Sequence, residues 1–71
     1  MIKYTIDNVE ALAEYANDSL LLKRTVANEP VLIFKRISED VVLPYNHWLH
    51  IDRENNYIVL TSDQYEELQS V

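Results

Sequence analysis

Two histidines and an aspartate lie close together in the sequence, and side chains of these types can hold a divalent metal ion. His47, His50 and Asp52 form the pattern H-x-x-H-x-D. On a helix the two imidazoles would share one face, whereas a β-strand would place them on opposite faces of a sheet. A metal site needs three or four converging ligands, and the chain contains two histidines and no cysteine. The sequence therefore predicts neither a bound metal nor another cofactor.

Serines and paired carboxylates are the other groups that could take part in catalysis. A nucleophilic serine needs a neighbouring base, and the four serines all occupy expected cap, turn or tail positions: Ser19, Ser38, Ser62 and Ser70. A carboxylate that acts as a general acid needs burial to raise its pKa, whereas the carboxylates here lie on expected solvent faces. The chain has no glycine, which excludes a glycine-rich phosphate loop. The sequence predicts a protein that is not an enzyme.

The charge balance indicates a protein partner rather than nucleic acid. Twelve acidic side chains stand against six basic ones, so the formal net charge is −6. Binding to a phosphate backbone depends on lysine and arginine, and this acidic excess disfavours it. The excess favours either solubility alone or a partner with a basic surface.

The length of 71 residues allows one domain, spanning residues 1–71. A domain of this size has a small core, so a second copy would add to its stability, and we expect a homodimer. The first residues do not have the pattern of a signal peptide, and no apolar run approaches the ~20 residues that span a bilayer. The sequence predicts a cytoplasmic protein, in a bacterium or a phage-infected host, without membrane association.

The first part of the chain has a helical pattern after a short strand over residues 2–6. Asp7 and Glu10 have the spacing of a capping box, and apolar residues then recur at helical spacing. A break near residues 17–19 would divide this part into two helices, and one long helix over residues 8–27 is the alternative. Pro30 disfavours helical geometry at the residue before it, so we expect helix to end by about residue 28.

The second part of the chain has the pattern of short strands. Residues 31–37 and 41–43 are expected to form a hairpin, because β-branched and aromatic residues favour a sheet. Residues 44–56 allow a short helix or, slightly favoured, a second hairpin that pairs residues 47–51 with 57–61. Thr61 begins a final helix in which Tyr65 and Leu68 face inward.

Together these elements predict an α+β fold. Two N-terminal helices, or one long helix, would pack on a small antiparallel sheet, and a short helix would end the chain.

The central stretch E-P-V-L-I-F-K-R, followed by a turn and V-V-L-P, resembles the N-terminal domain of the Phd/YefM antitoxin family. The resemblance implies a short strand, two helices, a hairpin and a further helix, in a dimer that binds operator DNA. The chain departs from the family at two points. Asn28 and residues 38–40 replace the usual glycines, and the first helix carries Glu10, Glu14 and Asp18 instead of basic residues.

A small acidic interaction protein is the first functional hypothesis. It would be encoded by a phage or prophage and would bind and inhibit a basic or nucleic-acid-binding target protein. The expected partner-binding residues are acidic and aromatic: Glu10, Glu14, Asp18, Trp48, Tyr57, Asp63, Glu66 and Glu67.

The resemblance gives the alternative hypothesis, an antitoxin-like DNA-binding autoregulator. The candidates for its DNA contacts are five of the six basic side chains: Lys3, Lys23, Arg24, Lys35 and Arg36.

Overall fold

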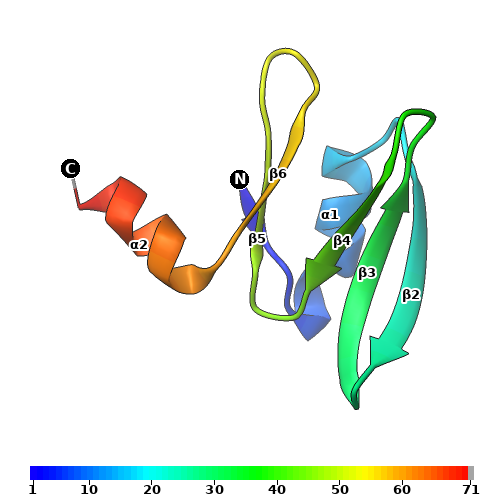
Figure 1. Cartoon of the computed structure of the whole chain (residues 1–71), viewed down its shortest axis with the longest axis horizontal. Helices are drawn as coiled ribbons and strands as arrows, with labels where there is room; N and C mark the ends of the chain where they lie inside the picture. Colours follow the sequence, from blue (N-terminus) through cyan, green and yellow to red (C-terminus); the bar gives the residue numbers. More distant parts are fainter. Residues whose placement is uncertain (71) are drawn as a thin grey trace.

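Strands dominate the computed structural model, which describes residues 1–70 (Figure 1). In chain order the elements are β1 (Ile2–Lys3), the 3-10 helix η1 (Ile6–Asn8), α1 (Val9–Tyr15), β2 (Leu20–Val26), β3 (Glu29–Lys35), β4 (Asp40–Pro44), β5 (Trp48–Ile51), β6 (Tyr57–Leu60) and α2 (Ser62–Gln69). The strands form two antiparallel sheets, in the orders β1-β5-β6 and β2-β3-β4. No helix within residues 1–70 is long and apolar enough to cross a membrane.

The predicted fold, in which N-terminal helices pack on one small antiparallel sheet, is wrong: strand β2 replaces the second helix, and the strands form two sheets. β2 pairs with β3 along its whole length, so that Leu21 lies opposite Phe34 and Lys23 opposite Leu32. Leu21 thereby packs against the core, whereas Val26 at the end of the strand is 59% exposed. The stabilisation that β2 gains by pairing with β3 is larger than the weak helical preference of this short segment. The helix pair implied by the resemblance to Phd/YefM antitoxins is therefore not found in residues 1–70.

Helix α1 is also shorter than predicted, and its start differs. η1 precedes it, and its N-cap residue Asn8 makes no capping side-chain hydrogen bond, so the expected capping box at Asp7 and Glu10 does not form. At the other end, the Ser19 hydroxyl donates a hydrogen bond to the Ala16 carbonyl oxygen at 2.9 Å. This local bond satisfies a carbonyl at the helix end and directs the chain into β2.

The predicted hairpins of the second part are confirmed. β3 pairs with β4, with Leu32 opposite Leu43, and β5 pairs with β6, with Leu49 opposite Val59. The alternative short helix over residues 45–50 is wrong. The final helix is confirmed as α2, but Leu68 is 56% exposed and does not face inward.

The core lies where the two sheets and α1 meet. Phe34 and Leu32 of β3, Leu49 of β5 and Leu12 of α1 are each 0% exposed and belong to one apolar cluster. Phe34 also meets Tyr57 of β6 edge-to-face, with ring centroids 6.0 Å apart. Because β3 and β6 belong to different sheets, this aromatic pair links the two sheets across the core.

The chain makes its tight turns without glycine. Positive φ angles occur at Asn28, Asn46 and Asn55, where asparagine tolerates the left-handed region, and at Ala27, where alanine does not. Ala27 and Asn28, at φ 52° and 66°, form a two-residue turn between β2 and β3. Two successive positive φ angles are typical of the type I′ turn, which matches the twist of the flanking strands.

We expect the substitution Ala27→Gly to stabilise the protein. Removing the Cβ relieves about 1–2 kcal/mol of left-handed strain, and the more flexible unfolded chain offsets about 0.4–1 kcal/mol of this gain. Urea unfolding should show a net rise of about 0.5–1 kcal/mol in the free energy of unfolding. The matched control is Ala13→Gly in the exposed part of α1, which should lower that free energy by about 1 kcal/mol. A loss of stability in Ala27→Gly would contradict the left-handed backbone conformation of residue 27 in this turn.

Candidate functional site

Three exposed carboxylates lie together on α2, the helix that projects from the body of the molecule (Figure 1). Asp63, Glu66 and Glu67, with Ser70, line an open hollow of about 460 Å³. We refer to Asp63, Glu66 and Glu67 as the α2 acidic face. All three were expected partner-binding residues, and the structure brings them together because they are three and four positions apart on one helix.

Both the start and the side of α2 are held in place. Thr61 and Gln64 form a capping box, in which the Gln64 amide donates to the Thr61 hydroxyl at 3.1 Å and the Thr61 amide donates to the Gln64 side chain at 2.9 Å. Tyr65 stacks on Trp48 of β5, with ring centroids 3.7 Å apart and an interplanar angle of 15°. The Ser62 hydroxyl donates to the Asn46 carbonyl oxygen at 3.1 Å. These contacts fix the direction in which the α2 acidic face points.

The charges of the α2 acidic face repel one another along the helix, although Asp63 in the first turn is favourably placed for the helix dipole. Asp63 lies three residues before Glu66 and four before Glu67, and like charges at these spacings destabilise a helix. Glu66 and Glu67 also lie towards the negative end of the helix dipole, where a cation is preferred, and the last turn of α2 has no basic residue. A cationic group bound among these carboxylates would relieve both effects.

A second acidic pair lies on α1 but at a different place on the surface. Glu10 and Glu14 are exposed and four residues apart on that helix. α1 lies behind the β2-β3-β4 sheet in Figure 1, whereas α2 lies beyond β5 and β6 on the other side of the view. The structure therefore divides the expected acidic residues into two separate surfaces.

Few of the carboxylates are neutralised within the chain. In the part of the chain that the structure describes there is one ion pair, between Lys35 Nζ and Asp40 Oδ2 at 3.9 Å. The remaining carboxylates, including both acidic surfaces, contribute unpaired negative charge. The surface potential is therefore suited to a positively charged partner.

Asp18 and Tyr57, two further expected partner-binding residues, instead bind each other. The Tyr57 hydroxyl donates to Asp18 Oδ1 at 2.5 Å, and the Asn55 side-chain amide donates to Asp18 Oδ2. The hydrogen bond from Tyr57, followed by that from Asn55, lowers the pKa of Asp18 below its usual value. Burial, then the hydrogen bond to Asp18, raises the pKa of Tyr57. This pair joins the loop after α1 to the β5–β6 hairpin and is structural.

Arg36 completes the same polar cluster. Its guanidinium group lies 4.1 Å from the centre of the Tyr57 ring and donates to the Asn55 carbonyl oxygen at 2.7 Å. Trp48 is likewise used within the chain, since it is half-buried and stacked on Tyr65. Of the eight expected partner-binding residues, the five helical carboxylates are thus the ones that are exposed and make no hydrogen bond or ring stack with another side chain of residues 1–70; Asp18 is exposed too, but it is bound to Tyr57 and Asn55.

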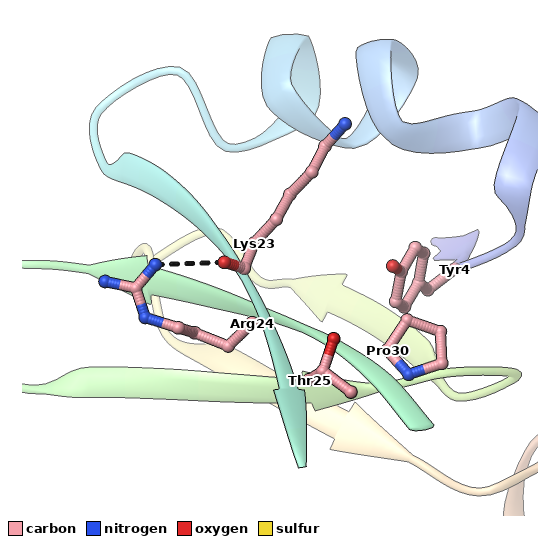
Figure 2. A pocket seen from close by; sticks show the side chains of 5 residues that line it. All are labelled: Tyr4, Lys23, Arg24, Thr25 and Pro30. Atoms are coloured by element: carbon pink, nitrogen blue, oxygen red, sulfur yellow. Dashed lines mark hydrogen bonds between the residues drawn. The ribbon is translucent and has the colours of Figure 1, made fainter. Parts of the chain in front are cut away.

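The basic side chains do not form one continuous patch. Lys23 and Arg24 line a hollow of about 410 Å³ with Tyr4, Thr25 and Pro30 (Figure 2). In Figure 2 the Lys23 side chain extends towards α1, whereas Arg24 points to the other face of the strand and donates to the Lys23 carbonyl oxygen at 3.0 Å.

The other basic residues proposed as DNA contacts either contact side chains of this chain or lie in the other sheet. Lys35 is paired with Asp40, Arg36 is held at Tyr57, and Lys3 lies in β1 of the other sheet.

The histidine pattern does not form a cluster of ligands. Within residues 1–70 no group of three histidine, cysteine or acidic side chains is placed to hold a metal. Asp52 instead organises the β5–β6 turn, where its Oδ1 accepts hydrogen bonds from the amides of Glu54 at 2.9 Å and Asn56 at 2.8 Å. These bonds, that of Asn56 first, lower the pKa of Asp52. His47 Nδ1 lies 3.1 Å from the Tyr45 carbonyl oxygen, and His50 lies in β5.

Sequence reasoning missed the contacts that give the site its geometry. The hydrogen bonds of Asp18 to residues 55 and 57 span 37 and 39 positions, and no local pattern indicates them. The stack of Trp48 on Tyr65 has a weak signal, because both aromatic residues follow short apolar runs.

The chain matches no protein-family model, no curated protein and no solved structure. The resemblance to Phd/YefM antitoxins therefore stays a prediction.

Proposed function

We propose that this chain is an acidic interaction protein that binds a protein with a basic surface and blocks that surface. The binding element is the α2 acidic face. The target class is a nucleic-acid-binding protein, whose lysines and arginines normally meet phosphate groups. The setting is the cytoplasm of a bacterium or of a phage-infected host.

One observation supports this proposal most strongly. α2 retains Asp63, Glu66 and Glu67 at spacings that destabilise a helix, without a basic residue in its last turn. Functional surfaces commonly sacrifice stability in this way. The stacked Trp48–Tyr65 pair and the capping box hold these carboxylates in a fixed arrangement, which reduces the entropy lost on binding.

The proposal is tested with two matched double variants. Glu66→Gln with Glu67→Gln removes two charges from the α2 acidic face, and Glu10→Gln with Glu14→Gln removes two from α1. Wild type and both variants are immobilised and exposed at low salt to the heparin-binding fraction of a bacterial lysate. Captured proteins are identified by mass spectrometry, and their affinities are then measured.

We expect wild type to retain a basic protein and the α2 variant to bind it about fivefold to thirtyfold more weakly. This range follows from ~0.5–1 kcal/mol for each exposed charge. The α1 variant should bind like wild type. Equal weakening by both variants would show that total charge, and not the α2 acidic face, determines binding.

A further inference from the structure

The side of the β2-β3-β4 sheet that points away from the core is largely apolar. Strand alternation places on it the residues next to those of the core face. In register across β2, β3 and β4, Leu22, Ile33 and Val42 form one row, and Arg24, Val31 and Pro44 form the next. We refer to this side as the outer sheet face. Its members are Leu20, Leu22, Arg24, Val26, Glu29, Val31, Ile33, Lys35, Asp40, Val42 and Pro44.

The outer sheet face is separate from the core. Val31 is 7% exposed but does not belong to the core cluster, and neither Leu22 nor Ile33 packs against that cluster. Leu20 and Val42 are 62% and 48% exposed. The face therefore has an apolar centre that is continuous across three strands and an exposed apolar margin. A connected apolar patch of this kind is typical of an interaction surface.

The charges on this face distinguish it from the rest of the molecule. Arg24 and Lys35 carry two positive charges, and Glu29 and Asp40 carry two negative ones, so the face is neutral in a chain of net charge −6. The six excess negative charges lie elsewhere. Two copies of this acidic chain can therefore meet through the outer sheet face without bringing like-charged patches into contact, whereas a basic partner finds no excess of negative charge there.

The chain alone is also less compact than its size allows. Its accessible surface is 5089 Å², against about 4,600 Å² for a compact monomer of this mass. Its radius of gyration is 11.9 Å, against about 11 Å for a compact domain of this length. The α2 helix that projects in Figure 1 extends the molecule in this way.

We propose that the outer sheet face is the contact surface of a homodimer. Two such faces would pack against each other as in a β-sandwich, with sheets about 10 Å apart. The row of Leu22, Ile33 and Val42 would form the centre. A three-stranded face covers only a few hundred Å², less than the ~800 Å² that each partner buries in a standard interface. We therefore expect a weak dimer.

This inference is independent of the proposed function. α2 lies on the other side of the molecule from the β2-β3-β4 sheet in Figure 1, so a dimer formed through the outer sheet face leaves both α2 acidic faces accessible. A partner with two basic surfaces could then bind with increased avidity.

Sedimentation equilibrium over a concentration series tests the dimer, with wild type and three single variants. Val42→Glu and Leu20→Glu each place a charge on the exposed margin of the outer sheet face. Leu68→Glu makes the same change of charge on α2, where Leu68 is 56% exposed. All three side chains are about half-exposed, so the substitutions should not disturb the core. Far-UV circular dichroism checks that each variant folds.

We expect wild type and Leu68→Glu to dimerise with the same dissociation constant and both face variants to dimerise at least tenfold more weakly. Three results would overturn the proposal. Wild type could remain monomeric at every concentration, both folded face variants could dimerise like wild type, or Leu68→Glu could dissociate as they do.

Discussion

Phe34→Ala should lower the free energy of unfolding by about 3–5 kcal/mol, a larger loss than we expect from any other single substitution. Phe34 is 0% exposed, and its ring joins β3 to Tyr57 of the other sheet. Truncating such a phenylalanine costs about 3–5 kcal/mol. A chain of this length has a total stability of about 4–11 kcal/mol, so the loss consumes much or all of it. The loss is global because the same ring holds both sheets together.

Urea unfolding and near-ultraviolet circular dichroism measure this loss of stability, and two further variants serve as controls. Phe34→Leu keeps an apolar side chain in the site and should cost about 1 kcal/mol. Ile37→Ala changes a fully exposed side chain and should stay within about 0.5 kcal/mol of wild type. A cost below 1 kcal/mol for Phe34→Ala would mean that the two sheets do not share this core.

Trp48→Ala should release α2 from the body of the protein. The indole stacks on Tyr65 at 3.7 Å and is the aromatic contact between α2 and β5. An aromatic pair contributes about 0.5–1.5 kcal/mol beyond its buried area, and the half-buried indole adds apolar contact with its neighbours, so we expect a loss of about 2–3 kcal/mol. An eight-residue helix is not stable on its own in water, and α2 should therefore lose most of its structure.

Hydrogen exchange separates this local effect from the global effect at Phe34. The Tyr65 amide donates to the Thr61 carbonyl oxygen at 3.0 Å. In Trp48→Ala the protection of this amide against exchange should fall sharply, whereas the amides of β3 should exchange more slowly than the Tyr65 amide. Trp48→Phe keeps a stacking ring and should retain most of the protection. If the Tyr65 amide stays protected in Trp48→Ala, then the stack does not anchor α2.

The parts of the fold that sequence reasoning predicted are those with local signals. The hairpins of β3 with β4 and of β5 with β6 follow from short apolar runs separated by polar turn residues. The start of α2 follows from Thr61 and Gln64, whose side chains form the capping box within four residues. In each case the stabilising interactions lie close together in the sequence.

β2 could not be predicted in the same way, because its turn is atypical. β2 pairs with β3 through a two-residue turn, so that Val26 lies opposite Glu29. The usual hairpin signal of Asn-Gly or Asp-Gly is absent, and Ala27-Asn28 takes its place. Without a glycine at this turn, the spacing of apolar residues over 20–26 favoured a helix.

The candidate site was predicted in its residue types but not in its geometry. The exposed carboxylates followed from charge and helical spacing. Their separation into one surface on α1 and another on α2 depends on how the two sheets place the helices, which composition does not determine. Asp18 and Tyr57 were expected to bind a partner because they are acidic and aromatic. Their mutual hydrogen bond spans 39 positions and has no local signal in the sequence.

We propose that the α2 acidic face competes with nucleic acid for a basic protein. Proteins of a bacterial lysate are bound to DNA-cellulose at low salt, and the purified chain is added as a competitor. We predict that wild type releases a DNA-binding protein and remains in solution with it, whereas the variant with Glu66→Gln and Glu67→Gln releases much less. Retention of wild type on the DNA-cellulose itself, or equal release by both proteins, would contradict this function.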